Sequence, residues 1–285
     1  MNAILSFVRR PAVAKRLIFY TGFLLVIALF FRWYGYHTVY PVPKEPVVPS
    51  PPPEPLVEVT IQGASGRISA WLMEPDAASE ETPLVVFFHG NAENLQLLFE
   101  VGFFHQIVSQ HCSILAVDFP GYGRSEGRPR EESLQDCGKA TLTWARESFP
   151  DRPLIIMGWS LGAAVAIRNA ADSGVDYQAL VLLSPWTRLG DLARHHFPNW
   201  MVRLFLAENY NSEEAAARIT KPTLVVHGTD DSIIPEVQGR QLAQAIATAR
   251  YEAVPMFGHN DIINAPLFWA ELNIFFQELA AERDP

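Results

Sequence analysis

The chain has 285 residues, of which 49% are hydrophobic and 19% are charged, and its formal net charge is −9 at pH 7. This composition indicates a globular protein with a substantial core, in one large domain or two smaller ones. The negative charge argues against nucleic acid and anionic lipid headgroups as general electrostatic partners.

An uncharged apolar run, LIFYTGFLLVIALFF, occupies residues 17–31. Four basic residues and no acidic residue precede it, and Arg32 follows it. As a helix the run spans about 22 Å, less than a hydrocarbon core of ~30 Å, but the basic and aromatic residues at its ends suit a membrane interface. We expect residues 1–36 to form a cytoplasmic tail and an uncleaved, single-pass transmembrane signal-anchor, with the remaining chain on the opposite, periplasmic or lumenal side.

Two other interpretations of this segment stay open. A cleaved signal peptide has the same basic start and run length, although no small-x-small cleavage site follows the run. A buried or interfacial helix is the third interpretation.

Residues 37–56 are expected to be a proline-rich linker, because half of positions 40–55 are proline. Such a stretch favours extended polyproline II and behaves as a semi-rigid spacer of about 3 Å per residue. We expect it to hold the following domain away from the bilayer.

Residues 57–285 alternate between short apolar runs and segments with helical periodicity. The expected strands are LVEVTI, RISAWLM, PLVVFFHG, SILAVDF, LIIMGWS, ALVLLSP, PTLVVHG and YEAVPMF. The expected helices include ENLQLLFEVGFFHQIVSQ, EESLQDCGKATLTWARESF, GAAVAIRNAADSG, PEVQGRQLAQAIATA and PLFWAELNIFFQELAAE. Continuous apolar runs suit strands that are covered on both faces, so the pattern predicts an α/β fold with a mainly parallel central sheet flanked by helices.

The pentapeptide GWSLG places Ser160 between an expected strand and an expected helix. Small residues at positions 158 and 162 allow a tight turn that holds a serine at the carboxyl edge of the sheet, next to the N–H groups of the helix. A nucleophilic serine needs a base and an orienting acid. HGTDDSIIP supplies Asp230 and Asp231 in one later turn, and GHNDI supplies His259 in the next.

These motifs, together with FFHGNAEN and DFPGYGRSEG, resemble the α/β-hydrolase superfamily. They are most similar to its short-lid serine hydrolases of the ABHD13, ABHD17 and Bem46 type, over roughly residues 57–280. The likeness implies the α/β-hydrolase fold for residues 57–285. It also implies a short lid at about residues 187–221.

The resemblance assigns Ser160 as nucleophile, His259 as general base and acid, and Asp231 rather than Asp230 as the orienting carboxylate. It places the oxyanion hole at the backbone N–H groups of Asn91 and Leu161. His89 and His227, which precede or begin turns, are expected to be structural.

Apolar residues in the expected lid follow the i, i+3, i+4, i+7, i+8 spacing of one helix face: Phe197, Trp200, Met201, Leu204 and Phe205. This face either packs over the core or forms an acyl-chain wall or membrane-docking surface. Under the second interpretation Trp200, Leu204 and Phe205 contact substrate.

The sequence therefore predicts a membrane-anchored serine hydrolase of the carboxylesterase or thioesterase type, with no metal or organic cofactor. Its expected partners are the membrane and an acyl ester or thioester, in a lipid or an acylated protein. Residues 1–56 lack the cysteine cluster of the depalmitoylating relatives, which argues against depalmitoylation. The alternatives are a serine peptidase acting on small peptides and a catalytically idle hydrolase-like binding module.

Overall fold

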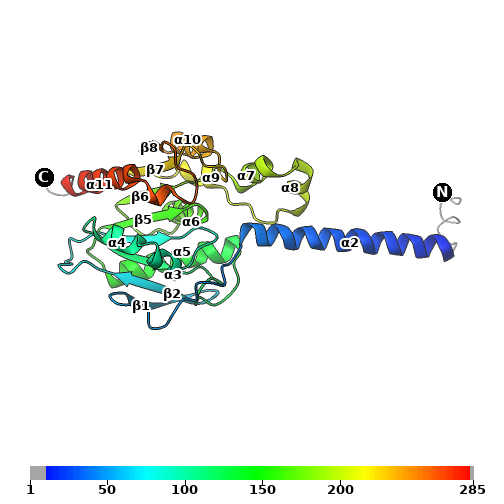
Figure 1. The fold of residues 1–285 in the computed structure, drawn as a ribbon, viewed down its shortest axis with the longest axis horizontal. Coiled ribbons are helices and arrows are strands. Elements are labelled where there is room, and N and C mark those ends of the chain that lie inside the picture. Colours follow the sequence, from blue (N-terminus) through cyan, green and yellow to red (C-terminus); the bar gives the residue numbers. More distant parts are fainter. Residues whose placement is uncertain (1–10, 283–285) are drawn as a thin grey trace.

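A computed structural model describes residues 11–282 of the chain. Its centre is an eight-stranded sheet in the order β1-β2-β4-β3-β5-β6-β7-β8 (Figure 1). The strands are β1 (Val57–Gly63), β2 (Gly66–Met73), β3 (Leu84–Phe88), β4 (Ser113–Val117), β5 (Leu154–Trp159), β6 (Ala179–Leu183), β7 (Thr223–Gly228) and β8 (Ala249–Val254). Strands β1 and β2 pair antiparallel, as do β2 and β4, and every other pair is parallel.

Helices cover both faces of the sheet. The helices that follow β2 in the chain are α3 (Leu95–Glu100), α4 (Phe103–Val108), α5 (Glu131–Ser148), α6 (Leu161–Asp172), α7 (Leu189–His196), α8 (Asn199–Phe205), α9 (Ser212–Ala216), α10 (Glu236–Ala245), the 3-10 turn η1 (Ile262–Asn264) and α11 (Pro266–Ala281). Residues of α5, α6 and α10 belong to one core cluster, and residues of α3, α4 and α11 belong to the other.

The strand sequences are continuously apolar because successive side chains enter these two clusters in turn. In β3, Leu84, Val86 and Phe88 lie in the cluster with α5 and α6, whereas Val85 and Phe87 lie in the opposite one. The α/β-hydrolase architecture, with its mostly parallel sheet between helices, is confirmed. All eight expected strands are present.

The single helix expected between residues 93 and 110 is wrong in one respect. The structure divides it into α3 and α4 at Gly102, whose φ of 75° lies in the left-handed region. A residue without a side chain adopts this conformation at little cost, so the chain can turn sharply there. Phe103 and Phe104 are consequently buried against the sheet.

The N-terminal helix α2 (Pro11–Val39) projects away from the domain in Figure 1. Among the described residues, α2 is the one helix that is long and apolar enough to cross a membrane, with mean hydropathy 1.8 between Ala14 and Val39. It continues past the expected run and ends at the domain, where Tyr40 is fully buried. The hydroxyls of Tyr40 and Tyr210 are 2.9 Å apart, which ties the end of the helix to the core.

The proline-rich segment that follows is not the free-standing spacer expected from its composition. Val48 is 3% exposed and packs in the core, and the side-chain amide of Asn94 donates to the backbone oxygen of Pro46 at 2.8 Å. The segment lies along the domain because its apolar residues find core contacts there. It cannot hold the domain far from the end of α2.

Candidate active site

Ser160 lies on a strained turn between β5 and α6. Its φ is 56° and its ψ is −114°, which a non-glycine residue rarely adopts, and its N–H donates to the carbonyl of Leu183 at 2.9 Å. A Cβ on Gly162 would lie 1.9 Å from the carbonyl oxygen of Phe88, and a Cβ on Gly158 would lie 2.2 Å from that of Gly162. Both glycines are therefore required by close backbone approach.

A chain of hydrogen bonds connects the three residues singled out by the motifs. The Oγ of Ser160 is 2.9 Å from Nε2 of His259, and Nδ1 of His259 is 2.7 Å from Oδ2 of Asp231. Ser160, His259 and Asp231 are 5%, 8% and 7% exposed, so all three are mostly shielded from water. Ser160 and His259 line a pocket, and Asp231 lies behind them. They come from the turns after β5, β7 and β8 at one edge of the sheet.

Asp231 is held in place from two sides. Its Oδ1 accepts from the N–H groups of Ile233 and Ile234 at 2.9 and 2.7 Å. Burial by itself would raise the pKa of this carboxyl, but hydrogen bonds from His227 and His259, the charge interaction with His259 and the N–H of Ile234 outweigh burial and lower the pKa well below its usual range. The group is therefore a carboxylate throughout the neutral range.

His227 contacts this carboxylate, which the sequence did not indicate. Its Nε2 is 3.2 Å from Oδ2 of Asp231 and 2.9 Å from the carbonyl oxygen of Ile234. The ring is completely buried. The four-residue spacing from His227, in β7, to Asp231, just after that strand, was the only signal available for this contact.

His89 has the structural role that was expected of it. Burial lowers its pKa to about 4, so the ring is neutral. Its Nδ1 lies 2.6 Å from the carbonyl oxygen of Gly90, and its Nε2 accepts from the N–H of Phe119.

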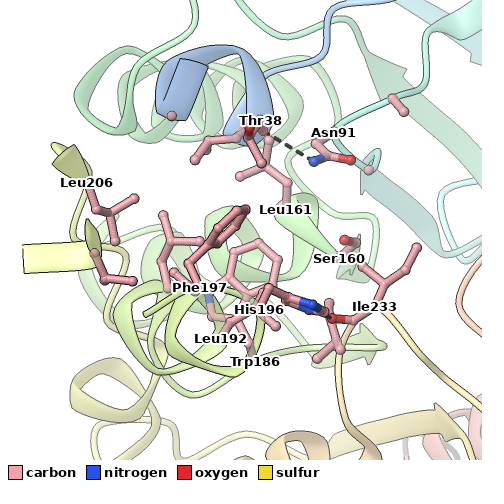
Figure 2. A pocket seen from close by; sticks show the side chains of 18 of the residues that line it. Thr38, Asn91, Ser160, Leu161, Trp186, Leu192, His196, Phe197, Leu206 and Ile233 are labelled. Carbon is pink, nitrogen blue, oxygen red and sulfur yellow. Dashed lines mark hydrogen bonds between the residues drawn. The ribbon is translucent and has the colours of Figure 1, made fainter. Parts of the chain in front are cut away.

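Asn91 and Leu161 line the same pocket as Ser160 (Figure 2). The side-chain amide of Asn91 points away from Ser160 and donates to the carbonyl of Val39 at 3.2 Å, while the hydroxyl of Tyr122 donates to the carbonyl of Asn91 at 2.9 Å. These two bonds fix the loop after β3 beside the serine.

Glu93 stabilises the same loop, and the sequence analysis did not identify it as a site residue. Its Oε2 accepts from the N–H of Gly90 at 2.7 Å, and the residue lines the pocket. Burial raises the pKa of this carboxyl to about 7, although the bond from Gly90 opposes the increase.

The pocket is a cavity of about 320 Å³, within the usual range of ~300–1,000 Å³ for small-molecule sites. Most of its lining is apolar, and it comes from α2, α7 and α8 as well as from the sheet edge. Figure 2 shows Thr38 at the end of α2 on one side, Phe197 and Leu192 on the other, and Ser160 and Leu161 between them.

The structure brings one of the three expected substrate contacts, Phe205, into the pocket. Trp200 and Leu204 are 60% and 61% exposed and do not line the pocket, whereas Phe205 is 8% exposed and lines it. Helix α8 turns Val202 and Phe205 inward, and Trp200 and Leu204, four residues apart, form a separate outward stripe.

Neither a metal cluster nor a disulfide is found within residues 11–282. No group of three or more His, Cys, Asp or Glu side chains there is arranged to hold a metal ion. Cys112 and Cys137 are both buried free thiols.

A family model described as serine aminopeptidase, S33, matches residues 79–211. The uncharacterized protein Rv2307c of Mycobacterium tuberculosis is 34% identical over 211 residues, which are 72% of each chain. Lysophosphatidylserine lipase ABHD12 of Danio rerio is 28% identical over 185 residues, which are 59% of this chain and 48% of that protein.

Solved structures share the fold at low sequence identity. Esterase PF2001 of Pyrococcus furiosus superposes with a TM-score of 0.67 at 17% identity, covering 84% of this chain and 98% of that one. Est1E of Butyrivibrio proteoclasticus superposes with a TM-score of 0.66 at 19% identity, covering 79% of this chain and 99% of that one. Together with the relative matched over 72% of both chains, these findings show that the chain belongs to the α/β-hydrolase superfamily, among its ABHD-like members.

Proposed function

We propose that this protein is a membrane-anchored serine hydrolase that cleaves an ester or thioester bond through an acyl-enzyme intermediate. Ser160 is the nucleophile, His259 the general base and acid, and Asp231 the orienting carboxylate. The observation that carries this proposal is the hydrogen-bonded chain from Ser160 Oγ to His259 Nε2 and from His259 Nδ1 to Asp231.

The geometry supports acyl transfer to water. His259 donates its Nδ1–H to Asp231, which leaves Nε2 free to take the proton of Ser160 as its oxygen attacks the acyl carbonyl. The backbone N–H groups of Asn91 and Leu161 hold the oxyanion, and His259 returns the proton to the leaving alcohol or thiol. Water then attacks the acyl-enzyme with His259 as base, releasing the carboxylic acid and restoring Ser160.

The apolar pocket favours a substrate with a hydrocarbon portion. One ABHD-like relative is named a lysophosphatidylserine lipase, so we propose a lipid acyl ester as the substrate class. The largely apolar lining of the cavity beside Ser160 supports the same choice.

A small-peptide peptidase is the second candidate, because the matching family model is described as a serine aminopeptidase. An aminopeptidase has to bind a substrate ammonium group, and Glu93 is the one Asp or Glu side chain among the described residues that line the pocket. Its carboxyl already accepts the N–H of Gly90, and its pKa is raised to about 7, so it is a poor partner for a cation. The ester is therefore the preferred substrate.

We also propose that α2 spans the membrane, with residues 1–36 as tail and signal-anchor and residues 57–285 as the hydrolase domain. The basic residues before the apolar run place the N-terminus in the cytoplasm and the domain on the periplasmic or lumenal side. A protease added outside sealed vesicles of known orientation would test this: digestion of the domain from the cytoplasmic face would contradict it.

The first test compares the full chain with Ser160→Ala, both reconstituted in phosphatidylcholine vesicles. Acyl esters and the matching thioesters of two to sixteen carbons are the substrates, with aminoacyl p-nitroanilides for the peptidase alternative. We expect ester turnover to fall at least ~10⁴-fold in the variant. Retained activity would remove Ser160 as nucleophile, and an inactive wild type would favour the idle binding module.

A further inference from the structure

The last turns of α2 form one wall of the pocket that contains Ser160. Phe31, Gly35 and Val39 all line it, and their four-residue spacing puts them on one face of the helix. The carbonyl of Val39 also accepts the side-chain amide of Asn91 at 3.2 Å. A helix expected only to tether the domain therefore supplies part of the pocket surface beside Ser160.

The length of α2 places this wall at the boundary of a bilayer. Residues 15–26 are all exposed, and the domain is contacted only by later turns. A hydrocarbon core of ~30 Å requires about 20 helical residues. Arg16 is the last of the basic residues that precede the apolar run, and a span of about 20 residues that begins after it ends at Tyr36. Phe31 and Gly35 therefore lie near the far edge of the hydrocarbon layer.

Helix α8 lies at the same depth because it packs directly on α2. The rings of Phe31 and Phe205 are stacked with centroids 4.7 Å apart. On the outer side of α8, Trp200 and Leu204 are exposed, and Phe30 and Trp33 of α2 are exposed as well. Tryptophan is enriched where a protein surface meets lipid headgroups, which fits this level of the molecule.

We propose that the pocket takes the acyl chain of its substrate directly from the bilayer, through an entrance between the end of α2 and α8. The inference rests on the proposed ester hydrolysis and adds that the anchor helix helps to select long-chain lipids. Phe31 and Gly35 on α2 and Phe205 on α8 form the entrance. An acyl chain on this path passes from lipid to apolar side chains without crossing water.

Gly35 offers a direct way to obstruct the entrance. A Cβ there would meet only the carbonyl oxygen of Phe205, at 3.5 Å, so alanine fits, whereas leucine adds three further carbons where α2 meets α8. Gly22 provides a matched control on the same helix, since no atom lies within 4 Å of its Cβ position. Gly35→Ala, Gly35→Leu and Gly22→Leu are made in the full chain.

The readout is a ratio of two turnover rates that share one leaving group. Each protein, in phosphatidylcholine vesicles, receives 4-methylumbelliferyl palmitate within the bilayer or 4-methylumbelliferyl butyrate in solution. We expect the palmitate-to-butyrate ratio to fall from wild type through Gly35→Ala to Gly35→Leu, by at least ~10-fold in the last. The Gly22→Leu ratio should equal that of the wild type.

Phe31→Ala and Phe30→Ala are a second pair, for use if Gly35→Leu fails to insert. The two positions are adjacent and at nearly the same depth, but Phe31 lines the pocket and Phe30 is 54% exposed on another face. The ratio should fall severalfold in Phe31→Ala and stay at the wild-type value in Phe30→Ala.

The outcomes separate this inference from the proposed function. An equal palmitate-to-butyrate ratio in Gly35→Leu and Gly22→Leu would overturn the proposed entrance. This holds even if Gly35→Leu lowers the palmitate and butyrate rates by the same factor. A wild type that hydrolyses butyrate but not palmitate would also overturn it and leave ester hydrolysis intact. Palmitate turnover that survives Ser160→Ala would contradict the proposed function instead.

Discussion

The two sides of the pocket are held in place by different forces. The sheet-edge site, which is Ser160, Asp231 and His259, is fixed by backbone and side-chain hydrogen bonds at the ends of β5, β7 and β8. The apolar wall, which we define as Phe31, Gly35, Phe197 and Phe205, is held largely by apolar contacts between α2 and the two lid helices α7 and α8, such as the stacking of Phe31 on Phe205.

In the proposed function, the sheet-edge site carries out the reaction and the apolar wall selects the substrate. Directional hydrogen bonds with little freedom hold reacting atoms to within fractions of an ångström, as proton transfer requires. Apolar contacts are non-directional and tolerate substitution of similar volume. Changes at the sheet edge should therefore reduce every activity together, whereas changes in the wall should alter which substrates are used.

The largest effect is expected from Gly162→Ala. Its methyl group would lie 1.9 Å from the carbonyl of Phe88, so the turn that carries Ser160 must move. We expect all ester turnover to fall at least ~100-fold and the free energy of unfolding to fall by about 2–3 kcal/mol. Gly190→Ala is the control, because its nearest atoms belong to the flexible Arg194 side chain at 3.7 Å or more; equal behaviour of the two variants would refute the argument.

Replacing His227 by Phe tests whether the sheet edge depends on the second histidine. The substitution keeps a ring of similar shape but removes the 3.2 Å contact with Asp231. We expect kcat to fall about 10- to 100-fold for short and long esters alike, because Asp231 orients His259 less well. His227→Gln, which keeps an N–H donor, should recover part of the loss; no recovery would indicate that ring packing alone matters.

Phe205 and Trp200 provide a matched test of the wall, since both are aromatic residues of α8 with opposite exposure. Phe205→Ala should lower the free energy of unfolding by about 3 kcal/mol and the long-chain to short-chain turnover ratio severalfold. Trp200→Ala should change the free energy of unfolding by no more than ~0.5 kcal/mol. Thermal unfolding in detergent measures the change in stability, and turnover of the palmitate and butyrate esters gives the ratio. A large loss of butyrate turnover in Trp200→Ala would restore that residue to the site.

The smallest effect concerns the pH dependence of stability at Glu93. Burial raises its pKa to about 7, so between about pH 4.5 and 7 the unfolded chain is ionised while the folded chain still holds the proton. Stability contributed by the protonated group is complete below this window and is lost as the pH rises through it. Glu93→Gln should flatten the decrease in Tm from pH 5 to pH 8, whereas Glu100→Gln, at an exposed position on α3, should follow the wild type.

At low pH the sign is reversed for Asp231. Its folded pKa lies below the ordinary value, so it stabilises the fold above the unfolded pKa of about 4, and this contribution is lost as the pH falls further. The Tm of the wild type should therefore pass through a maximum on the acidic side of neutrality. A Tm that rises steadily to pH 8 would contradict the assignment for Glu93, and a Tm that stays constant below pH 4 would contradict the assignment for Asp231.

Much of the sheet-edge site could be predicted because its parts are local in sequence. Each of Ser160, Asp231 and His259 follows directly after an apolar run, and parallel strands bring the turns at their carboxyl ends to one edge. His227 and Glu93 were missed as site residues for the opposite reason. Their roles depend on which atoms they face after folding, and neither residue type nor spacing specifies that.

The residues of the apolar wall were harder to predict from the sequence than those of the sheet-edge site. Helical spacing grouped Trp200, Leu204 and Phe205 on one apolar face, but α8 is short and packs against α2, so Phe205 faces the pocket and the other two face outward. The proline-rich segment was predicted as a spacer because composition reports backbone preference. A backbone preference does not specify which side chains of the segment contact the core.

The sequence by itself determined the α/β architecture, the order of the strands along the chain and the three residues of the sheet-edge site, because periodicity and turn motifs act over a few neighbouring residues. Only the tertiary structure decided that the end of α2 joins the pocket. That contact brings Phe31 against Phe205 across more than half of the chain, and it depends on the surface that each helix leaves unpaired after the core has formed.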